Sequence, residues 1–367
     1  MKVCVTGATG FVGAHVTAKL VQAGHEVKVT VRDRSRLRAL EGVDVEPVEV
    51  NVLDRRALRR AFAGCELVFH AAGLVASRPE SEVWRVNAIG PRFAVEAAAR
   101  AGVRRVVVTS SVGALGPARG GRAANEQNRW PEQGTGLIYT DAKHEGELAA
   151  LEAGDRLGLD VVAVNPAYVL GTALNRRLAG ETSTRIVANY IMGRLPAIVD
   201  SFTNIVDVED VARGHVLAAR KGRAGEQYIL GGDNLRWSDV IARVAQLSGI
   251  EHPIIVLPPA IASAAGALGR IGGGGGAVEG MRLMAPDWRY SSAKARRELG
   301  YAPRSATETL RRTVDWYLEL IEDDRMPARR TRSFDHASGA VRLADRLGLL
   351  LPLKVAGSVA GRRTVLG

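Results

Sequence analysis

The chain has 367 residues, of which 46% are hydrophobic, enough for a sizeable core in one large domain or two joined lobes. No apolar run approaches the roughly 18 residues of a membrane span, and the seven histidines lack ligand spacing, so we expect no metal site. The net charge of +11 is uneven: residues 325–367 carry nine Arg or Lys against two Asp, or +7, leaving +4 on residues 1–324. This distribution indicates a basic tail and argues against a nucleic-acid-binding body.

The first predicted elements are a short strand, a glycine turn and a helix. Residues 3–5 are apolar and rich in β-branched side chains, and after Gly7 an apolar helical pattern starts at Phe11. In this context Gly7 permits a tight turn, Gly10 lets the backbone approach a pyrophosphate, and Gly13 lets helix and strand pack closely. The free N–H groups of the helix would face the phosphates. We therefore predict a dinucleotide site, the alternative being a structural turn in a flavodoxin-like domain.

Strands and helices alternate over the next 150 or so residues. The predicted strands cover residues 26–31, 43–50, 67–71, 106–109 and 159–164, with a helix over 83–101. This alternation predicts an α/β fold, a Rossmann-type doubly wound parallel sheet with the glycine turn at its carboxyl edge. The two cysteines, Cys4 and Cys65, then lie in or beside strands, as buried thiols of a reducing cytoplasm. The chain enters its first strand directly, so we expect no signal peptide and a cytoplasmic location.

The alternation ends at Pro166. Helices are predicted over 182–192, 208–219, 237–247, 260–271 and 307–321, short strands over 203–206 and 227–230, and a loop at the five glycines 272–276. The prediction divides the chain into a dinucleotide-binding domain (1–166 plus about 204–231), a smaller, mostly helical substrate lobe (167–203 plus 232–324) and a basic tail (325–367).

Tyr139 and Lys143 form the second motif, YTDAK, whose spacing puts both side chains on one helical face. A phenol with a pKa of about 10 is a poor base at neutral pH, and a nearby ammonium favours the phenolate. Tyr139 would exchange a proton with a substrate hydroxyl or carbonyl while a nicotinamide exchanges hydride. Lys143 would also hold the nicotinamide ribose. The alternative is an exposed pair without a catalytic role.

A third motif lies 28 residues before Tyr139, where the predicted fifth strand ends in Thr109-Ser110-Ser111. A hydroxyl at this place can donate to the substrate oxygen. The three motifs, in this order, resemble the TGxxGxxG, SSxxxxG and YxxxK of the extended short-chain dehydrogenase/reductase superfamily, and the resemblance runs from residue 1 to about 320. It implies that Ser111, five residues before Gly116, is the catalytic serine, with Ser110 as the second choice.

The same resemblance implies how a dinucleotide would lie. Asn51 and Val52 would flank the adenine, and residues 71–73 would line the cofactor channel. Residues 165–169 would run past the amide group of the nicotinamide. His70 is interpreted as a strand-end histidine without a catalytic role. The implied cofactor residues are Gly7, Thr9, Gly10, Phe11, Val12, Gly13, Asn51, Val52, Ala71, Ala72, Gly73, Tyr139, Lys143, Pro166 and Val169.

The end of the second predicted strand indicates which dinucleotide binds. NAD-specific members of the superfamily place an acidic residue there for the ribose diol. Here the position is Val31, followed by Arg32, Asp33 and Arg36. Planar guanidinium groups suit a 2′-phosphate, so we predict NADP(H) rather than NAD(H), held by Arg32 and Arg36. The alternative is a solvated loop in which Asp33 partly neutralises the arginines.

Two departures from the superfamily bear on the substrate. Ala142 replaces the serine of the frequent YxxSK, a minor loss. Nucleotide-sugar epimerases usually carry an arginine before the strand written here as NIVDV, where the chain has Phe202-Thr203-Asn204 and no cation. Two segments resemble dihydroflavonol 4-reductase-like proteins and bacterial hopanoid-associated sugar epimerases, within the NAD-dependent epimerase/dehydratase family. They are TNIVDVEDVARGHVLA and YSSAKARRELGYAP.

These observations predict an NADP-dependent oxidoreductase that acts on a carbonyl or secondary alcohol of a small, partly apolar molecule. The alternatives are a sugar epimerase that retains its cofactor and a non-catalytic NADP-binding scaffold. We also expect a homodimer, because the helices over 83–101 and 138–157 have wide apolar faces. The tail includes a basic segment with an apolar face at 341–353. That segment is expected to dock on the protein's own surface or a neighbouring subunit, or to contact an anionic membrane surface.

Overall fold

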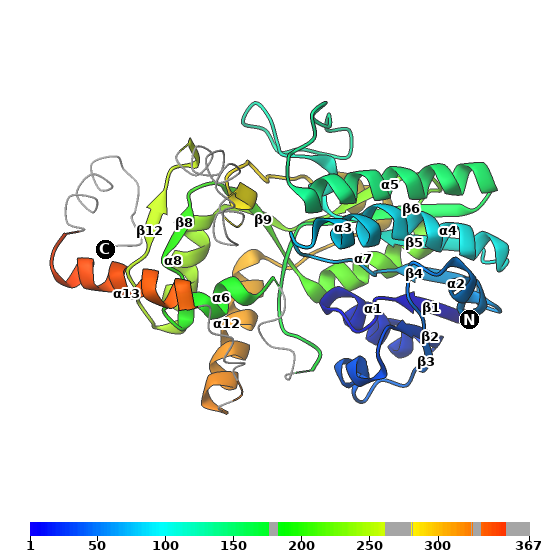
Figure 1. Ribbon diagram of the computed structural model, residues 1–367, viewed down its shortest axis with the longest axis horizontal. Helices are drawn as coiled ribbons and strands as arrows, with labels where there is room; N and C mark the ends of the chain where they lie inside the picture. Colours follow the sequence, from blue (N-terminus) through cyan, green and yellow to red (C-terminus); the bar gives the residue numbers. More distant parts are fainter. Residues whose placement is uncertain (176–182, 261–279, 281, 324, 326–331, 350–367) are drawn as a thin grey trace.

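The computed structural model describes residues 1–175, 183–260, 280, 282–323, 325 and 332–349. Its larger lobe is built on a seven-stranded sheet in the order β10-β6-β5-β4-β1-β2-β3, in which every pairing is parallel (Figure 1). The strands are β1 (Lys2–Thr6), β2 (Glu26–Val31), β3 (Glu46–Glu49), β4 (Leu67–His70), β5 (Arg105–Thr109), β6 (Asp160–Pro166) and β10 (Gln227–Leu230). The Rossmann-type sheet predicted from the sequence is confirmed.

Alternate strand residues enter two separate cores. On one face Val3 and Val5 of β1 pack with residues of α1 (Phe11–Gln22) and α7 (Val208–Lys221). On the other face Cys4 packs with residues of α2 (Arg55–Phe62), α4 (Gly90–Arg100) and α5 (Ile138–Leu157). Because both faces are covered, the strands are apolar almost throughout, as parallel strands usually are. The opposite directions of alternate side chains explain why one short strand stabilises both layers.

The helix predicted over 83–101 is interrupted. It consists of α3 (Glu80–Trp84), a π-helical turn (Arg85–Ile89) and α4. Pro91 has no N–H to donate to the carbonyl of residue 87, which favours a break at this point. The freed carbonyl of Asn87 lies against Gly146 of α5, where a Cβ would be only 1.9 Å from the carbonyl oxygen. Glycine at 146 therefore lets α5 approach the turn closely.

The smaller lobe holds a three-stranded sheet, β11-β9-β7, a two-stranded sheet, β12-β8, and several helices. Its strands are β7 (Tyr168–Leu170), β8 (Ala197–Val199), β9 (Phe202–Asp207), β11 (Asp233–Arg236) and β12 (Ile255–Leu257), and its main helices are α6 (Arg185–Ile191), α8 (Trp237–Ser248) and α12 (Ala306–Glu322). Four of these strands are absent from the sequence prediction, because three or four residues are too few to show an alternating pattern.

The chain crosses between the lobes more than once. After β9 in the smaller lobe it forms α7 and β10 on the larger sheet, and α11 (Ala293–Leu299) later returns to pack against α7 and β10. The predicted helix over 260–271, beyond Ala260, and the glycine loop over 272–276 lie outside the described residues. The division of the chain at the predicted domain boundaries stays a prediction.

A buried charge cluster ties the two lobes together. Asp207 and Asp210, at the start of α7, are fully buried. Arg304, which precedes α12, donates to Asp210 at 3.1 Å and approaches Asp207 at 3.5 Å, while Arg312 of α12 donates to Glu209 at 2.6 Å. Buried carboxylates are stable only when paired and hydrogen-bonded. The cluster therefore fixes α12 of the smaller lobe to α7 of the larger one.

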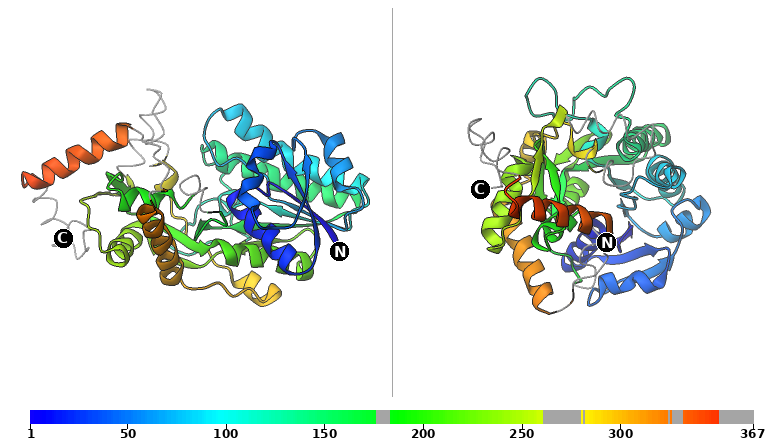
Figure 2. Two further views of the ribbon diagram at one scale, coloured as in Figure 1. Left: turned by 90° about the horizontal axis from the view of Figure 1, so that it is seen from below. Right: turned by 60° about the vertical axis from the view of Figure 1, so that its left-hand side comes forward.

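The described part of the tail is α13 (Arg332–Arg346), at the end of the molecule farthest from the larger sheet (Figure 2). Val341 is buried with Ile255 of β12, and Arg342 donates to the carbonyl of Gly193 at 2.6 Å. One side of α13 thus packs on the smaller lobe. Among the described residues, no helix combines the length and apolar character that crossing a bilayer requires.

Candidate active site

A pocket of about 440 Å³ lies at the carboxyl edge of the large sheet. Ten of the residues predicted to hold a dinucleotide line it: Gly7, Thr9, Gly10, Arg32, Arg36, Asn51, Val52, Ala71, Ala72 and Gly73. The sequence analysis missed its remaining lining residues, which are Thr30, Val31, Val50, Leu53, Leu74, Pro79, Ser81, Glu82, Arg85 and Val86. Phe11, Val12, Gly13, Tyr139, Lys143, Pro166 and Val169 are not part of its wall.

The glycine turn is packed too tightly for side chains. Gly7 has φ = +67°, and a Cβ there would lie 2.5 Å from the backbone nitrogen of Ala72. A Cβ at Gly13 would lie 2.2 Å from the carbonyl oxygen of Gly7. Helix α1 begins directly after Gly10, and the first-turn N–H groups of any helix lack intrahelical acceptors. The turn therefore has the narrow shape and the free donors that a pyrophosphate requires, and the residues present fit a dinucleotide.

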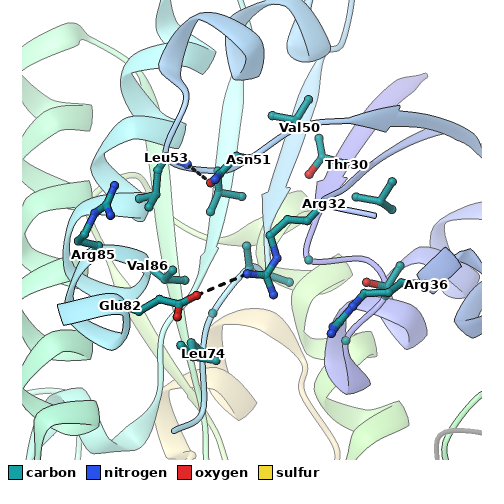
Figure 3. A pocket seen from close by; sticks show the side chains of 18 of the residues that line it. Thr30, Arg32, Arg36, Val50, Asn51, Leu53, Leu74, Glu82, Arg85 and Val86 are labelled. Atoms are coloured by element: carbon teal, nitrogen blue, oxygen red, sulfur yellow. Dashed lines mark hydrogen bonds and ion pairs between the residues drawn. The ribbon is translucent and has the colours of Figure 1, made fainter. Parts of the chain in front are cut away.

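The two pocket arginines differ in their partners. Arg32 extends toward Glu82 of α3, with 3.7 Å between Nη1 and Oε1, whereas Arg36 lies on the other side of Arg32 (Figure 3). Asp33 accepts from the backbone N–H and the hydroxyl of Ser35, and these bonds lower the pKa of its carboxyl. Asp33 is thus engaged in its own turn, and the carboxylate beside Arg32 comes instead from Glu82, 50 residues later.

One end of the pocket lies beside the motif that contains Tyr139 and Lys143. A Cβ at Gly73 would be 3.2 Å from Nζ of Lys143 and 3.2 Å from Oδ1 of Asn87. The side chain of Asn87 accepts from the N–H of Leu74 at 3.0 Å and donates to its carbonyl at 2.8 Å, which fixes this end of the pocket. A dinucleotide with its adenine end at Arg32 would therefore reach Lys143 with its other end.

Lys143 is almost fully buried on α5. Its ammonium donates to the carbonyl oxygen of Thr109, at the end of β5, at 3.0 Å. Burial lowers its pKa to about 8, while the charge of Glu147 opposes this shift. Lys143 is therefore still mostly charged at pH 7. A positive charge is what a residue needs in order to bind ribose hydroxyls and to stabilise a phenolate.

Tyr139, in the first turn of α5, faces Ser111, which follows β5. Burial raises the pKa of the Tyr139 phenol, and a hydrogen bond with the Ser111 side chain lowers it by a smaller amount. Lys143 lies one helical turn away and its described hydrogen bond goes to Thr109. In this arrangement the net effect of burial is to favour the protonated phenol.

The two candidate serines have different surroundings. Ser111 is partly exposed at the site, and its hydroxyl accepts from the N–H of Gly113 at 3.1 Å. Ser110 is buried and faces Glu147, behind the site. This placement supports Ser111 as the residue that can reach a substrate.

His70 at the end of β4 has a structural environment. Its Nδ1 is hydrogen-bonded to the hydroxyl of Thr6 at 2.9 Å. Burial first, and the charge of Lys143 second, lower its pKa to about 3, so the imidazole is neutral. A neutral, fully buried ring bonded to its neighbouring strand fits the interpretation as a strand-end histidine.

The position where nucleotide-sugar epimerases are expected to carry an arginine is used for internal contacts. Asn204 accepts from the N–H of Gly232 at 2.8 Å and donates to Asn234, joining β9 to β11. The ring of Phe202 lies between two guanidinium groups, 4.5 Å from Arg236 and 4.1 Å from Arg289. These cations, missed in the sequence, are each ion-paired, Arg236 with Asp200 and Arg289 with Asp287.

The sequence analysis missed two residues beside the site, Asn87 and Glu147. Asn87 lies in the π-helical turn, for which the sequence gives no signal beyond Pro91. Glu147 is fully buried one further turn along α5 from Lys143. Its spacing of four residues could have been recognised by extending the argument already applied to Tyr139 and Lys143.

Comparisons with known proteins agree with this geometry. The model of the NAD dependent epimerase/dehydratase family matches residues 3–231. The chain is 31% identical to the putative dihydroflavonol 4-reductase of Synechocystis, over 85% of this chain and 93% of that protein. It is 33% identical to sterol demethylase protein B of Methylococcus capsulatus, over 87% and 99% of the two chains.

Two solved structures share the fold. The protein gox2253 is 31% identical, with a TM-score of 0.76 over 89% of this chain and 99% of that chain. The dTDP-glucose 4,6-dehydratase of Streptomyces venezuelae, solved with NAD bound, has a TM-score of 0.71 over 87% and 97% of the two chains, and at 23% identity this likeness concerns the fold alone. The chain therefore belongs to the NAD dependent epimerase/dehydratase family and is an NAD(P)-dependent oxidoreductase.

Proposed function

We propose that the protein reduces a carbonyl group of a small, partly apolar molecule, with NADPH as hydride donor. The observation that carries this proposal is that Lys143 lies beside Gly73 at one end of the pocket, while Tyr139, one helical turn away on α5, is hydrogen-bonded to Ser111. When bound, the nicotinamide supplies the hydride. The named activities of two relatives, a dihydroflavonol reductase and a sterol demethylase protein, support an apolar substrate.

Each catalytic residue has a separate task in this proposal. Ser111 donates a hydrogen bond to the substrate oxygen and holds it near Tyr139. The Tyr139 phenol, kept protonated by burial, transfers its proton to that oxygen as the carbonyl is reduced. Lys143 binds the ribose next to the nicotinamide and places a positive charge one turn from the phenol, where the phenolate then forms.

A sugar epimerase with a retained cofactor is the alternative. An epimerase must turn its keto intermediate within the closed site, which is easier when a remote group anchors it. The two guanidinium groups beside Phe202 are already paired with carboxylates, and Asn204 is engaged in β-sheet contacts. This arrangement disfavours a nucleotide-sugar diphosphate, and it leaves other sugars open. A non-catalytic scaffold is disfavoured by the intact catalytic residues.

The first prediction concerns Tyr139→Phe. The variant should reduce ketone probes, a dihydroflavonol and a 3-ketosteroid, at least about 100-fold more slowly than wild type, because a general acid typically contributes 10²–10⁴-fold. Its dissociation constant for NADPH, measured by fluorescence titration, should change by less than about threefold. A rate within a few-fold of wild type would remove Tyr139 from the mechanism.

The cofactor preference is carried by Arg32 and Arg36. Both line the pocket beside the end of β2, where no acidic side chain comes from the strand itself. We propose that they bind the 2′-phosphate of NADP(H), and that the phosphate replaces Glu82 as the partner of Arg32. A guanidinium matches a phosphate better than a single carboxylate because it can donate two parallel hydrogen bonds.

The second prediction is that Arg32→Ala weakens NADP⁺ binding by about 10- to 100-fold, the loss of one charge-assisted hydrogen-bonding group. NAD⁺ binding should change by less than about twofold. Isothermal titration calorimetry measures both, and Arg34→Ala, an exposed arginine outside the pocket wall, is the matched control. Equal affinity of the wild type for NAD⁺ and NADP⁺ would contradict the assignment.

We also propose a homodimer formed through α4 and α5. These helices pack against each other on one face of the sheet, and α5 leaves Leu148 39% exposed. A second copy would cover this side chain in an apolar contact. The third prediction is that light scattering at micromolar concentration gives twice the chain mass, and that Leu148→Glu lowers it to the monomer mass. A monomeric wild type would refute the proposal.

The protein is further proposed to be cytoplasmic and to reach anionic membrane surfaces through its tail. Leu343 is 58% exposed on α13, and Leu347 and Leu349, directly after it, are 64% and 66% exposed. The tail carries a net +7 in sequence. Exposed leucines beside basic residues suit the interface of an anionic bilayer, while Val341 and Arg342 hold α13 on the lobe.

The fourth prediction tests this contact by co-sedimentation with phosphatidylcholine vesicles, with and without phosphatidylglycerol. The wild type should bind only the anionic vesicles. Replacement of both Leu343 and Leu347 by serine should reduce the bound fraction at least about threefold, because less apolar area enters the bilayer. Equal binding of wild type and variant would exclude a membrane contact through these leucines, and no binding by either would exclude a membrane contact altogether.

A further inference from the structure

A buried carboxylate lies behind the catalytic lysine. Glu147 is on α5, one helical turn after Lys143, and is 3% exposed. Its Oε2 accepts a hydrogen bond of 2.5 Å from the side-chain amide of Asn165, near the end of β6. None of the roles proposed above uses Glu147. A buried carboxylate costs stability unless it is paired and hydrogen-bonded, so its partners indicate what it does.

The first partner, Asn165, connects Glu147 to the catalytic serine. The same amide nitrogen also donates to the backbone carbonyl of Ser111 at 3.1 Å. An amide whose N–H groups are held by two acceptors has one orientation. Glu147 thus joins α5 to the ends of β5 and β6, the segments that carry Ser111 and Pro166. Gly146 packs against the carbonyl of Asn87, so α5 cannot shift toward the π-helical turn to loosen this contact.

The second partner is the charge of Lys143. Among the described residues, Lys143 and Glu147 act on each other through their charges, and the Lys143 charge also acts on His70 of β4. The polar neighbours at the ends of β5 and β6 are the uncharged Thr109, Ser110 and Asn165. His70 is neutral. Among the described residues, Glu147 is the carboxylate whose charge acts on Lys143.

Glu147 ionises near neutral pH. Burial raises its pKa to about 7, against the opposing effects of Ser110, Asn165 and the Lys143 charge. When Glu147 is ionised it raises the pKa of Lys143, which burial alone would lower further. Above about pH 7 Glu147 is mostly ionised, so its charge opposes the effect of burial on Lys143 most strongly there.

We propose that Glu147 is a positioning residue for the catalytic site: through Asn165 it fixes the backbone of Ser111, and through its charge it holds the Lys143 ammonium in its protonated form. The second half rests on the proposed function, because it matters for turnover only if Lys143 takes part in it. Glu147 touches neither the pocket wall nor the reacting atoms, and it acts through its neighbours.

The fifth prediction uses Glu147→Gln, which keeps an oxygen acceptor for Asn165 and removes the charge. The ratio of kcat at pH 8.5 to kcat at pH 6 should fall about tenfold relative to wild type, since loss of a nearby opposite charge moves a pKa by about one unit or more. The fall is expected at high pH because the pKa of Lys143 drops in the variant. As the pH rises, Lys143 then loses its charge, and the enzyme its activity, at a lower pH than in wild type. A purely structural role would lower kcat by the same factor at every pH.

Two variants control this measurement. Glu145→Gln removes a carboxylate from the exposed face of the same helix and should leave the pH profile unchanged. Glu147→Asp keeps the charge and should restore most of the activity at pH 8.5, although its shorter side chain weakens the bond to Asn165. A Glu147→Gln profile parallel to that of wild type, or a Glu147→Asp profile like that of Glu147→Gln, would overturn the proposal.

A second readout separates this proposal from the proposed function. In ¹⁵N-lysine-labelled protein, the NMR titration of Lys143, assigned with Lys143→Arg, should shift to lower pH by about one unit in Glu147→Gln. This measurement needs no substrate. If Lys143 has the same pKa in Glu147→Gln as in wild type, the proposed effect of Glu147 on Lys143 is wrong, whatever reaction the enzyme catalyses. If it shifts while Tyr139→Phe retains full activity, the role of Glu147 stands and the proposed mechanism fails.

Discussion

The burial of the Lys143 ammonium is the constraint on which the catalytic site depends. Removing a charged group from water is costly, and the cost is offset only by close partners. The carbonyl of Thr109 accepts a hydrogen bond from it, Glu147 supplies the opposite charge, and Gly73 leaves room beside it. These partners come from β5, α5 and the segment after β4. The large sheet, α5 and the pocket wall must therefore lie close together around the Lys143 side chain.

A second constraint is the lack of space at the glycine turn. Gly13 lies against the carbonyl of Gly7, and Gly7 lies against the backbone after β4, so both positions exclude a Cβ. This packing brings the start of α1 to the pocket that continues to Gly73 and Lys143. Phosphates at the turn and a nicotinamide at Tyr139 would thus be bound by one continuous edge of the sheet, the edge where open parallel sheets bind ligands.

Much of this arrangement could be predicted from local sequence patterns. The large sheet and the lining residues Gly7 and Gly10 follow from alternation and motif spacing, because parallel strands bring their carboxyl ends together. The lining residue Asn51 was implied by the family resemblance alone. Glu82 could not be predicted, since it approaches Arg32 from a helix 50 residues later. The short strands of the smaller lobe were missed because their pairing depends on tertiary contacts, and the guanidinium groups beside Phe202 come from Arg236 and Arg289, distant in sequence.

The proposed reaction is net reduction of a carbonyl by hydride from NADPH, with the proton from Tyr139. The most direct measurement follows deuterium from NADPH labelled at the transferred position into a ketone probe, by mass spectrometry of the product and quantitation of NADP⁺. We expect one deuterium in each product molecule and one NADP⁺ for each product. An isomerised product without net consumption of NADPH, from protein that retains its dinucleotide through gel filtration, would contradict reduction and establish epimerisation instead.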